Sequence, residues 1–354
     1  MLDGKVPDAC RACVRKEKLG LKSTRGAFWN YYNSGPEPYY EDMWFYDKLT
    51  PEFPQFPSRM EFRFSNLCNM KCRMCDETSS SEWAKEKVKF DLPPNPDNNQ
   101  DDMFETKKQT NLKITEDKIA GLKDLKLLRF LSKICFTGGE PFLIKEYYDY
   151  LDFLIDNKLN SKIEIETFTN CSVYNPLFVD RLLKFKKVEL VMSIDGVGKT
   201  AEYIRHGTDW DTVSANVRRF NSLGDPFQLY ITVAISAYTL LDVSSLSKFL
   251  MELSAQNPNI LFKGYSVMTR GLNFPNTPDY LRPVMIEQIN ESIAILTDPN
   301  WKVFRTELQN IKTSLLNDIP NPKHKDSFYD FTSTMDRVRN ESFEETFGLP
   351  LKQT

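Results

Sequence analysis

The chain has 354 residues, a formal net charge of −3 and two histidines, His206 and His324. This balance gives no support for a nucleic-acid surface, and so few histidines nearly exclude a histidine-based metal centre or proton relay. The sequence has no run of about 18 apolar residues and no apolar core of a signal peptide near its start. We therefore expect a cytoplasmic protein without a membrane span.

Residues 1–57 form an N-terminal extension that lacks strand–helix alternation. Its most informative feature is the pair Cys10 and Cys13, which supplies half of a four-thiolate site. A zinc half-site or two free thiols would give the same pattern.

A second and denser cysteine group follows the first predicted strand, within residues 58–75. Cys68, Cys72 and Cys75 have the spacing C-x3-C-x2-C. A structural zinc site takes four protein ligands, whereas three thiolates on a [4Fe-4S] cluster leave one iron without a protein ligand. That iron is then free to bind a ligand from solution. A zinc half-site or three incidental cysteines is the alternative.

The segment up to residue 270 predicts regular alternation of strands and helices, with a polar surface loop over 91–112. After the first strand, we expect strands over 131–136, 162–168, 188–194, 228–236 and 259–267. Helices are expected over 79–90, 114–128, 144–157, from Pro176 after Asn175, 209–223 and 243–253. Six such units predict an α/β fold: a partial (β/α)6, TIM-like barrel with a parallel sheet, open on one side.

Residues 271–354 depart from this alternation and predict a mostly helical C-terminal extension, with helices over 279–296 and 311–316. The segment contains no cysteine, so we expect no cluster domain there. A packed extension is the simplest interpretation; closing the open side of the barrel or holding a substrate are the alternatives.

Polar and glycine-rich motifs stand where the predicted strands end. They are Gly138-Gly139-Glu140-Pro141, Thr169-Asn170 and Ser193-Ile194-Asp195-Gly196. Two adjacent glycines let a backbone approach a ligand closely, and barrel enzymes place their chemistry at the carboxyl ends of strands. The motifs are therefore expected to share one end of the barrel with the three cysteines.

These motifs and the cysteine spacing together resemble the radical S-adenosylmethionine (radical SAM) superfamily over about residues 58–270. The resemblance implies a [4Fe-4S] cluster on Cys68, Cys72 and Cys75 that reduces S-adenosylmethionine, releasing a 5′-deoxyadenosyl radical. The cofactor-binding residues that it implies are Met74, Gly138, Gly139, Glu140, Thr169, Asn170, Ser193, Asp195 and Arg205.

Each implied residue has an expected role. Met74 stands where the family often has an aromatic residue, and a thioether also packs on adenine. The Gly138–Glu140 segment would hold the methionine ammonium, and Arg205 the carboxylate. Polar groups at the ends of the third and fourth strands would bond ribose or substrate.

The N-terminal Cys10 and Cys13 resemble the end of a twitch/SPASM-type cluster-binding segment. In such relatives further cysteines precede this point, whereas this sequence begins there. The sequence therefore leaves open a shortened form, ligands from elsewhere, or an auxiliary iron–sulfur cluster or zinc.

Two other cysteines and one carboxylate need separate interpretation. Cys135 lies within a predicted strand and is expected to be a buried apolar residue. Cys171 follows Asn170, where relatives usually have glycine; it is a candidate hydrogen-atom donor or cluster ligand, or has no role. With no histidine in these motifs, Asp195, a Glu or a Tyr is the expected base.

The sequence thus predicts an enzyme that uses an external electron donor such as flavodoxin or ferredoxin. A peptide or protein is the first expected substrate, and a sugar, nucleotide or other small molecule the second. A non-catalytic iron–sulfur or zinc binding module is the alternative of another class. A zinc hydrolase fails for lack of histidine ligands.

Overall fold

The computed structural model describes Val14 and residues 57–92, 112–266, 271–272, 274, 277–317 and 322–352. The chain divides into two compact units, Met1–Phe56 and Pro57–Thr354. The predicted strand–helix alternation and the three-cysteine loop both belong to the second unit. Cys10, Cys13 and most of the loop predicted over 91–112 lie outside the described residues.

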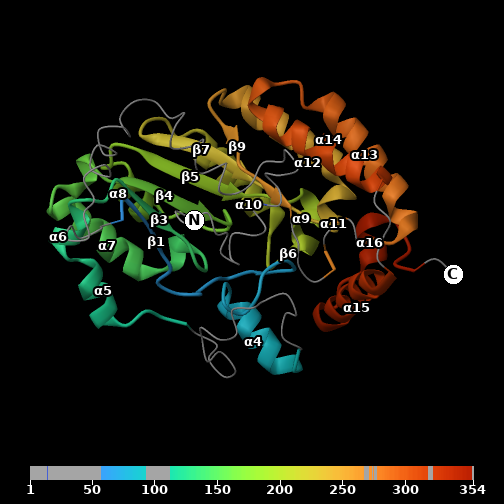
Figure 1. Ribbon diagram of the computed structural model, residues 1–354, viewed down its shortest axis with the longest axis horizontal. Coiled ribbons are helices and arrows are strands. Elements are labelled where there is room, and N and C mark those ends of the chain that lie inside the picture. The colour runs from blue at the N-terminus through green and yellow to red at the C-terminus, as the bar shows by residue number, and fades with distance from the viewer. Residues whose placement is uncertain are drawn as a thin grey trace. The chain divides into compact units, whose positions relative to one another are not determined.

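A six-stranded parallel sheet forms the centre of this unit. Its strands, in spatial order, are β1 (Arg59–Phe62), β3 (Lys133–Phe136), β4 (Glu164–Thr169), β5 (Val188–Ser193), β7 (Phe227–Thr232) and β9 (Leu261–Phe262). Figure 1 shows the strands following each other across the sheet in chain order. Every neighbouring pair is parallel. This confirms the predicted α/β fold, a partial barrel built from strand–helix units.

Helices between the strands begin where the sequence predicts. They are α4 (Ser81–Phe90), α7 (Lys145–Asp156), α8 (Pro176–Leu182), α10 (Trp210–Asn221) and α12 (Val243–Gln256). The Asn175 side chain accepts a hydrogen bond from Leu177 N, and Asp209 accepts one from Thr212 N. Each cap satisfies a backbone N–H that has no partner within its helix, which fixes the start of that helix.

The two faces of the sheet differ in chemistry, because successive side chains of a strand point in opposite directions. One face carries Phe62, Ile134, Ile165 and Leu190, all buried in the hydrophobic core. Against it packs α7, whose Tyr150 ring meets Phe62 edge-on at 5.2 Å. This apolar face supplies the burial that holds the helices on the sheet.

The opposite, inner face carries buried charges. Lys133 Nζ lies 2.7 Å from Glu189 and 3.3 Å from Glu166, and Arg59 and Lys263 also pair with Glu166. We call these five residues the inner-face network. It replaces the branched apolar side chains that fill a closed barrel.

Three predicted elements are interrupted. The helix expected over 114–128 is divided into α5 (Glu116–Leu122) and α6 (Leu125–Leu128), because Asp124 caps a new helix by accepting from Lys126 N. The strand expected over 228–236 is divided into β7 and β8 (Ala234–Ile235). At the start of β8 the Asp195 carboxylate accepts a hydrogen bond from Ala234 N. Residues 259–267 likewise form β9 and β10 (Tyr265–Ser266), and β10 pairs with β8.

The C-terminal extension is helical, as predicted. It consists of α13 (Arg282–Ile295), α14 (Lys302–Asn317), α15 (Pro322–Arg339) and α16 (Phe343–Phe347). Of these helices, α15 and α16 were not predicted from the sequence. Figure 1 shows them in red, on the opposite side of the sheet from α5 and α6. No helix in the described part of the chain has the length and apolar character to cross a bilayer.

Candidate active site

The cysteine loop, residues 68–75, is held by backbone contacts on two sides. Within it β2 (Lys71–Cys72) pairs antiparallel with β6 (Arg205–His206), so Cys72 stands opposite Arg205. Arg73 N donates to Ile204 O at 2.8 Å, and the Trp83 indole of α4 donates to Cys72 O at 2.7 Å. The loop is therefore positioned by a strand on one side and a helix on the other.

The three thiols differ in how readily they ionise. A hydrogen bond from Cys75 lowers the pKa of Cys72 to about 7, against the effect of burial and with help from the Arg205 guanidinium. Arg205 Nη1 lies 3.7 Å from Cys72 Sγ. Burial raises the pKa of Cys68 to about 12, and donating to Cys72 raises the pKa of Cys75. Cys72 is thus the thiol prepared to act as a thiolate.

The arrangement of these thiols fits an iron–sulfur cluster better than one zinc ion. A structural zinc ion takes four protein ligands, and this loop offers three thiols. A [4Fe-4S] cluster instead offers a separate iron to each thiolate, and the nearby Arg205 guanidinium offsets part of their negative charge.

Gly138 and Gly139 follow β3, and they let the loop after β3 approach the residues just before Cys68. A Cβ added to Gly139 would lie 2.0 Å from Leu67 O, and one on Gly138, whose φ is +106°, would lie 2.5 Å from Ser65 O. Gly139 N donates to Ser65 O at 3.1 Å. The sequence led us to expect a close approach to a ligand; these contacts show that the chain itself already requires glycine here.

Glu140 joins this loop to the end of β4. Its carboxylate is buried and accepts from Phe142 N at 3.2 Å and from Asn170 N at 2.6 Å. Burial raises the pKa of Glu140 to about 7, although these hydrogen bonds oppose the shift. The Asn170 side chain in turn lies 3.8 Å from Cys68 Sγ. Glu140 therefore fixes two strand ends beside the cysteine loop.

Asp195 and Arg205 form a buried ion pair at the same end of the sheet. Arg205 Nε lies 2.6 Å from Asp195 Oδ2, and Asp195 Oδ1 accepts from Ala234 N at 2.7 Å. Arg205 therefore stands between a carboxylate and the Cys72 thiol. Arg205, a predicted cofactor-binding residue, therefore lies beside the cysteines and is paired with the candidate base Asp195.

Cys171 lies just after β4, and its backbone conformation explains why the resembled family usually has glycine at this position. Its φ is +61°, in the left-handed region. The residue is fully buried, Asn216 donates to its carbonyl at 2.9 Å, and burial raises its thiol pKa. Cys135 is also buried, within β3 on the inner face.

The structure thus assembles most of the predicted residues at one end of the sheet. Direct contacts connect Cys68, Cys72, Cys75, Gly138, Gly139, Glu140, Thr169, Asn170, Asp195 and Arg205. Met74 is half-buried against the hydrophobic core, and Ser193 ends β5. Further residues that contact the cysteine loop or its surroundings were not predicted from the sequence: Arg73, Trp83, Asp336, Arg339 and Glu341.

The family model of the Radical SAM superfamily matches residues 62–247. This range exceeds half of the chain. The chain belongs to the radical SAM superfamily. Membership in this superfamily implies a [4Fe-4S] cluster and S-adenosylmethionine.

No curated protein matches the chain. Two solved structures that match are of Streptococcus suis SuiB. The one bound to precursor peptide SuiA is 14% identical with a TM-score of 0.39, covering 73% of this chain and 53% of that one. The one bound to S-adenosylmethionine is 13% identical with a TM-score of 0.41, covering 81% and 58%. This chain spans little more than half the length of those SuiB chains.

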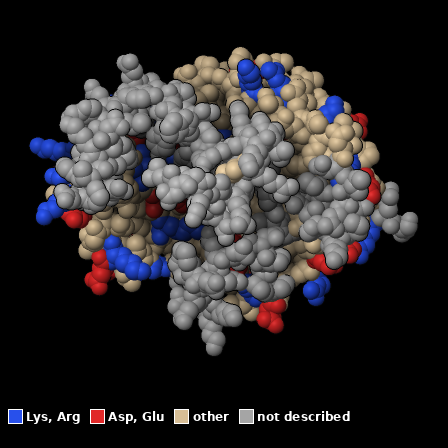
Figure 2. Space-filling view, in the orientation of Figure 1, with Lys and Arg blue, Asp and Glu red and all other residues tan. Residues whose placement is uncertain are grey.

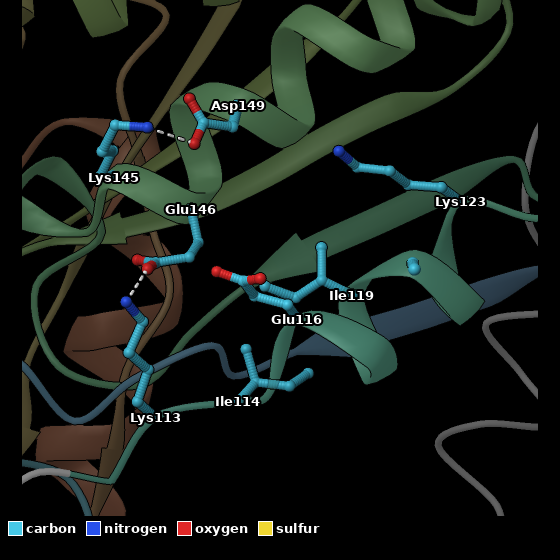
Figure 3. A pocket seen from close by; sticks show the side chains of 9 residues that line it. Lys113, Ile114, Glu116, Ile119, Lys123, Lys145, Glu146 and Asp149 are labelled. Atoms are coloured by element: carbon cyan, nitrogen blue, oxygen red, sulfur yellow. Dashed lines mark hydrogen bonds and ion pairs between the residues drawn. The ribbon is translucent and has the colours of Figure 1, made fainter.

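A pocket lies apart from the cysteines and is lined by α5, the residues just before it and the first turns of α7. This pocket has a volume of about 390 Å³, and its charged lining is largely paired: Lys113 with Glu146, and Lys145 with Asp149 (Figure 3). Figure 2 likewise shows basic and acidic side chains interspersed over the described part of the visible face. The lining of the pocket has three lysines and three carboxylates, so it presents no excess of one charge to a ligand.

Proposed function

We propose that this radical SAM enzyme binds its cluster through Cys68, Cys72 and Cys75 and acts on a peptide or protein. When bound, the cluster supplies the electron that cleaves S-adenosylmethionine to methionine and a 5′-deoxyadenosyl radical, which abstracts hydrogen from the substrate. The observation that carries the assignment is the cysteine loop itself, in which Cys72 Sγ lies 3.7 Å from Arg205 Nη1.

The remaining residues have proposed roles that follow from their positions. Arg205 binds the carboxylate of the cofactor, with Asp195 fixing its guanidinium. The backbone around Gly138 and Gly139 receives the ammonium group. Since both Glu140 oxygens already accept backbone hydrogen bonds, Glu140 acts by holding this segment in place.

Polar groups at neighbouring strand ends complete the proposed cofactor site. Thr169 and Ser193 are the last residues of β4 and β5, and Asn170 follows Thr169. Their polar groups are proposed to bond ribose or substrate. Met74 provides a thioether for the adenine ring. Asp195 remains the candidate base, while the buried Cys171 is a hydrogen donor only to a substrate that reaches the end of β4.

The peptide assignment depends on Cys10 and Cys13 in the N-terminal unit, whose sequence resembles a twitch/SPASM-type segment. An auxiliary cluster there would favour a peptide or protein substrate. A sugar, nucleotide or other small molecule is the second candidate. The electron donor is proposed to be a flavodoxin or ferredoxin.

Anaerobic reconstitution tests the proposal. We expect at least about four irons per wild-type chain and 5′-deoxyadenosine after adding dithionite and S-adenosylmethionine. Cys72→Ala should lose about four irons and all 5′-deoxyadenosine, whereas Cys135→Ala, which removes a buried thiol outside the loop, should keep both. Iron binding without any 5′-deoxyadenosine would support the non-catalytic binding module instead.

The auxiliary site has its own test. Additional iron that disappears in Cys10→Ala/Cys13→Ala would support an auxiliary cluster and a peptide substrate. Unchanged iron in this variant would contradict the auxiliary cluster and favour the small-molecule alternative.

A further inference from the structure

Residues near the C-terminus contact the cysteine loop through a buried arginine. Arg73 lies between Cys72 and Cys75 in the sequence, and its side chain is fully buried. Its Nη2 lies 2.6 Å from Asp336 Oδ1 and 2.7 Å from Glu341 Oε2. These carboxylates are more than 250 residues away in the chain. A buried guanidinium requires such partners, because an unpaired buried charge is strongly destabilising.

Arg73 is also fixed in orientation. Its Nε donates to Tyr203 O at 3.0 Å, and its guanidinium lies 3.6 Å above the Tyr203 ring. Asp336 accepts a further hydrogen bond from the Tyr203 hydroxyl at 2.7 Å and another from Phe343 N at 2.8 Å. The arginine therefore connects the loop to α9 (Gly198–Ile204), α15 and α16 at once.

A second contact joins the last residue of α15 to the other side of the loop. Arg339 pairs with the buried Glu86 at 2.7 Å, and Glu86 pairs with Lys71 at 2.6 Å. The Arg339 guanidinium lies 5.3 Å from the ring of Trp83, whose indole donates to Cys72 O. Arg339 thus supports both the helix and the strand that carry this part of the loop.

These contacts reach the residues on either side of Cys72. Lys71 and Cys72 are consecutive in β2, so their side chains point to opposite faces, and Arg73 follows in a turn. The Cys72 thiol faces Arg205, while both neighbours bind carboxylates. Glu341 also pairs with His206 of β6 at 2.5 Å. The contacts of Lys71 and His206 therefore hold the strand pair β2 and β6 on the face opposite the Cys72 thiol.

We infer that Asp336, Arg339 and Glu341 are positioning residues that hold the cysteine loop in its cluster-binding geometry. We call these three residues the C-terminal clamp. This role goes beyond the proposed function and is independent of the substrate. The clamp acts on the geometry of the loop, and its effect on iron retention rests on the proposed function.

The test compares clamp variants with matched neighbours on the same helices. Asp336→Asn/Glu341→Gln is paired with Asp330→Asn/Glu345→Gln, and Arg339→Gln is paired with Arg337→Gln. The control positions are exposed. Arg339→Lys keeps the charge toward Glu86 and serves as the conservative variant.

The first measurement uses the metal-free protein. Alkylation rates of the loop thiols, read by mass spectrometry, should rise in both clamp variants and stay at the wild-type rate in the controls. Arg339→Lys should fall between Arg339→Gln and wild type. Equal rates in clamp variants and controls would overturn the inference.

The second measurement separates positioning from fold stability. At a temperature where circular dichroism shows all variants fully folded, clamp variants should retain iron against a chelator on the order of tenfold less well, as outer partners of metal ligands do. The electron paramagnetic resonance spectrum of the reduced cluster should also shift. Wild-type iron retention and a wild-type spectrum in the clamp variants would show that the clamp residues only pack against the loop, which would overturn the inference. If wild type binds no iron while the alkylation difference persists, the proposed function fails and the clamp stands.

Discussion

Two groups of buried ion pairs in the second unit use the same chemistry in different settings. The inner-face network joins Lys133, Glu166 and Glu189 on adjacent strands, which backbone hydrogen bonds already hold in register. The C-terminal clamp instead joins α15 and the residues after it to a loop whose only strand has two residues. Removing one partner from the sheet network is therefore expected to lower the stability of the fold, whereas removing one at the loop is expected to change the geometry of the site.

The largest expected effect is at the contact between the two loops of the site. In Gly139→Ala the new Cβ would lie 2.0 Å from Leu67 O, a backbone atom that cannot move aside cheaply. We expect a loss of about 3 kcal/mol in unfolding free energy, measured by urea titration, together with loss of iron binding. Gly224→Ala is the control, since its Cβ would meet nothing within 4 Å. Equal stability of the two variants would contradict the close approach.

A substitution in the inner-face network tests the comparison directly. Lys133→Met removes the ion pair to Glu189 and one of the cations beside Glu166. We expect a loss of about 3 kcal/mol in unfolding free energy, with iron per folded chain unchanged. The exposed Lys184→Met should change neither. If fully folded Lys133→Met lost iron, the inner-face network would affect the cluster site as the C-terminal clamp does, which would contradict the comparison.

The pH dependence of stability should report the same network. Although burial acts in the opposite direction, the hydrogen bond from Lys263 and the neighbouring cations lower the pKa of Glu166. The contribution of ionised Glu166 to the unfolding free energy is therefore complete above the pKa of the unfolded chain, about 4.3. It is lost as the pH falls through the lower pKa of the folded state. Urea titrations between pH 7 and pH 3 should show a shallower decline for Glu166→Gln than for wild type. A decline as steep as that of wild type would contradict this contribution; the exposed Glu116→Gln should behave like wild type.

The smallest expected effect is at Cys171. Alanine and glycine both remove the thiol, but only glycine adopts a φ of +61° without strain. Cys171→Gly should therefore be more stable than Cys171→Ala by about 1 kcal/mol. Thermal unfolding of the two variants measures the difference, and a more stable alanine variant would contradict the left-handed conformation.

Local patterns explain why much of the fold could be predicted from the sequence. The alternation of apolar strands and capped helices, such as the Asn175 and Asp209 caps, depends on neighbouring residues. The three cysteines were found by their spacing, and the motifs at strand ends by their place after predicted strands and by the resemblance to the radical SAM superfamily. Interruptions such as the break at Ala234 could not be found, because the carboxylate that causes it lies 39 residues away.

The clamp was missed for the same physical reason. Arg73 stands in the sequence as one basic residue between two cysteines, and nothing near it indicates burial. Its partners Asp336 and Glu341 belong to a charged C-terminal segment whose helices were not predicted. Only the folded chain brings them to the loop.

The cysteine loop is proposed to hold a cluster with one iron available to S-adenosylmethionine, and every other proposed role depends on this. The most direct test is the electron paramagnetic resonance spectrum of the reduced, reconstituted wild type, recorded before and after S-adenosylmethionine is added. We predict a cluster signal that changes shape on addition. In Cys10→Ala/Cys13→Ala, which leaves the cysteine loop as the one proposed cluster site, this signal should disappear once Cys72→Ala is added. A signal that ignores S-adenosylmethionine, or that persists in this triple variant, would contradict the proposal.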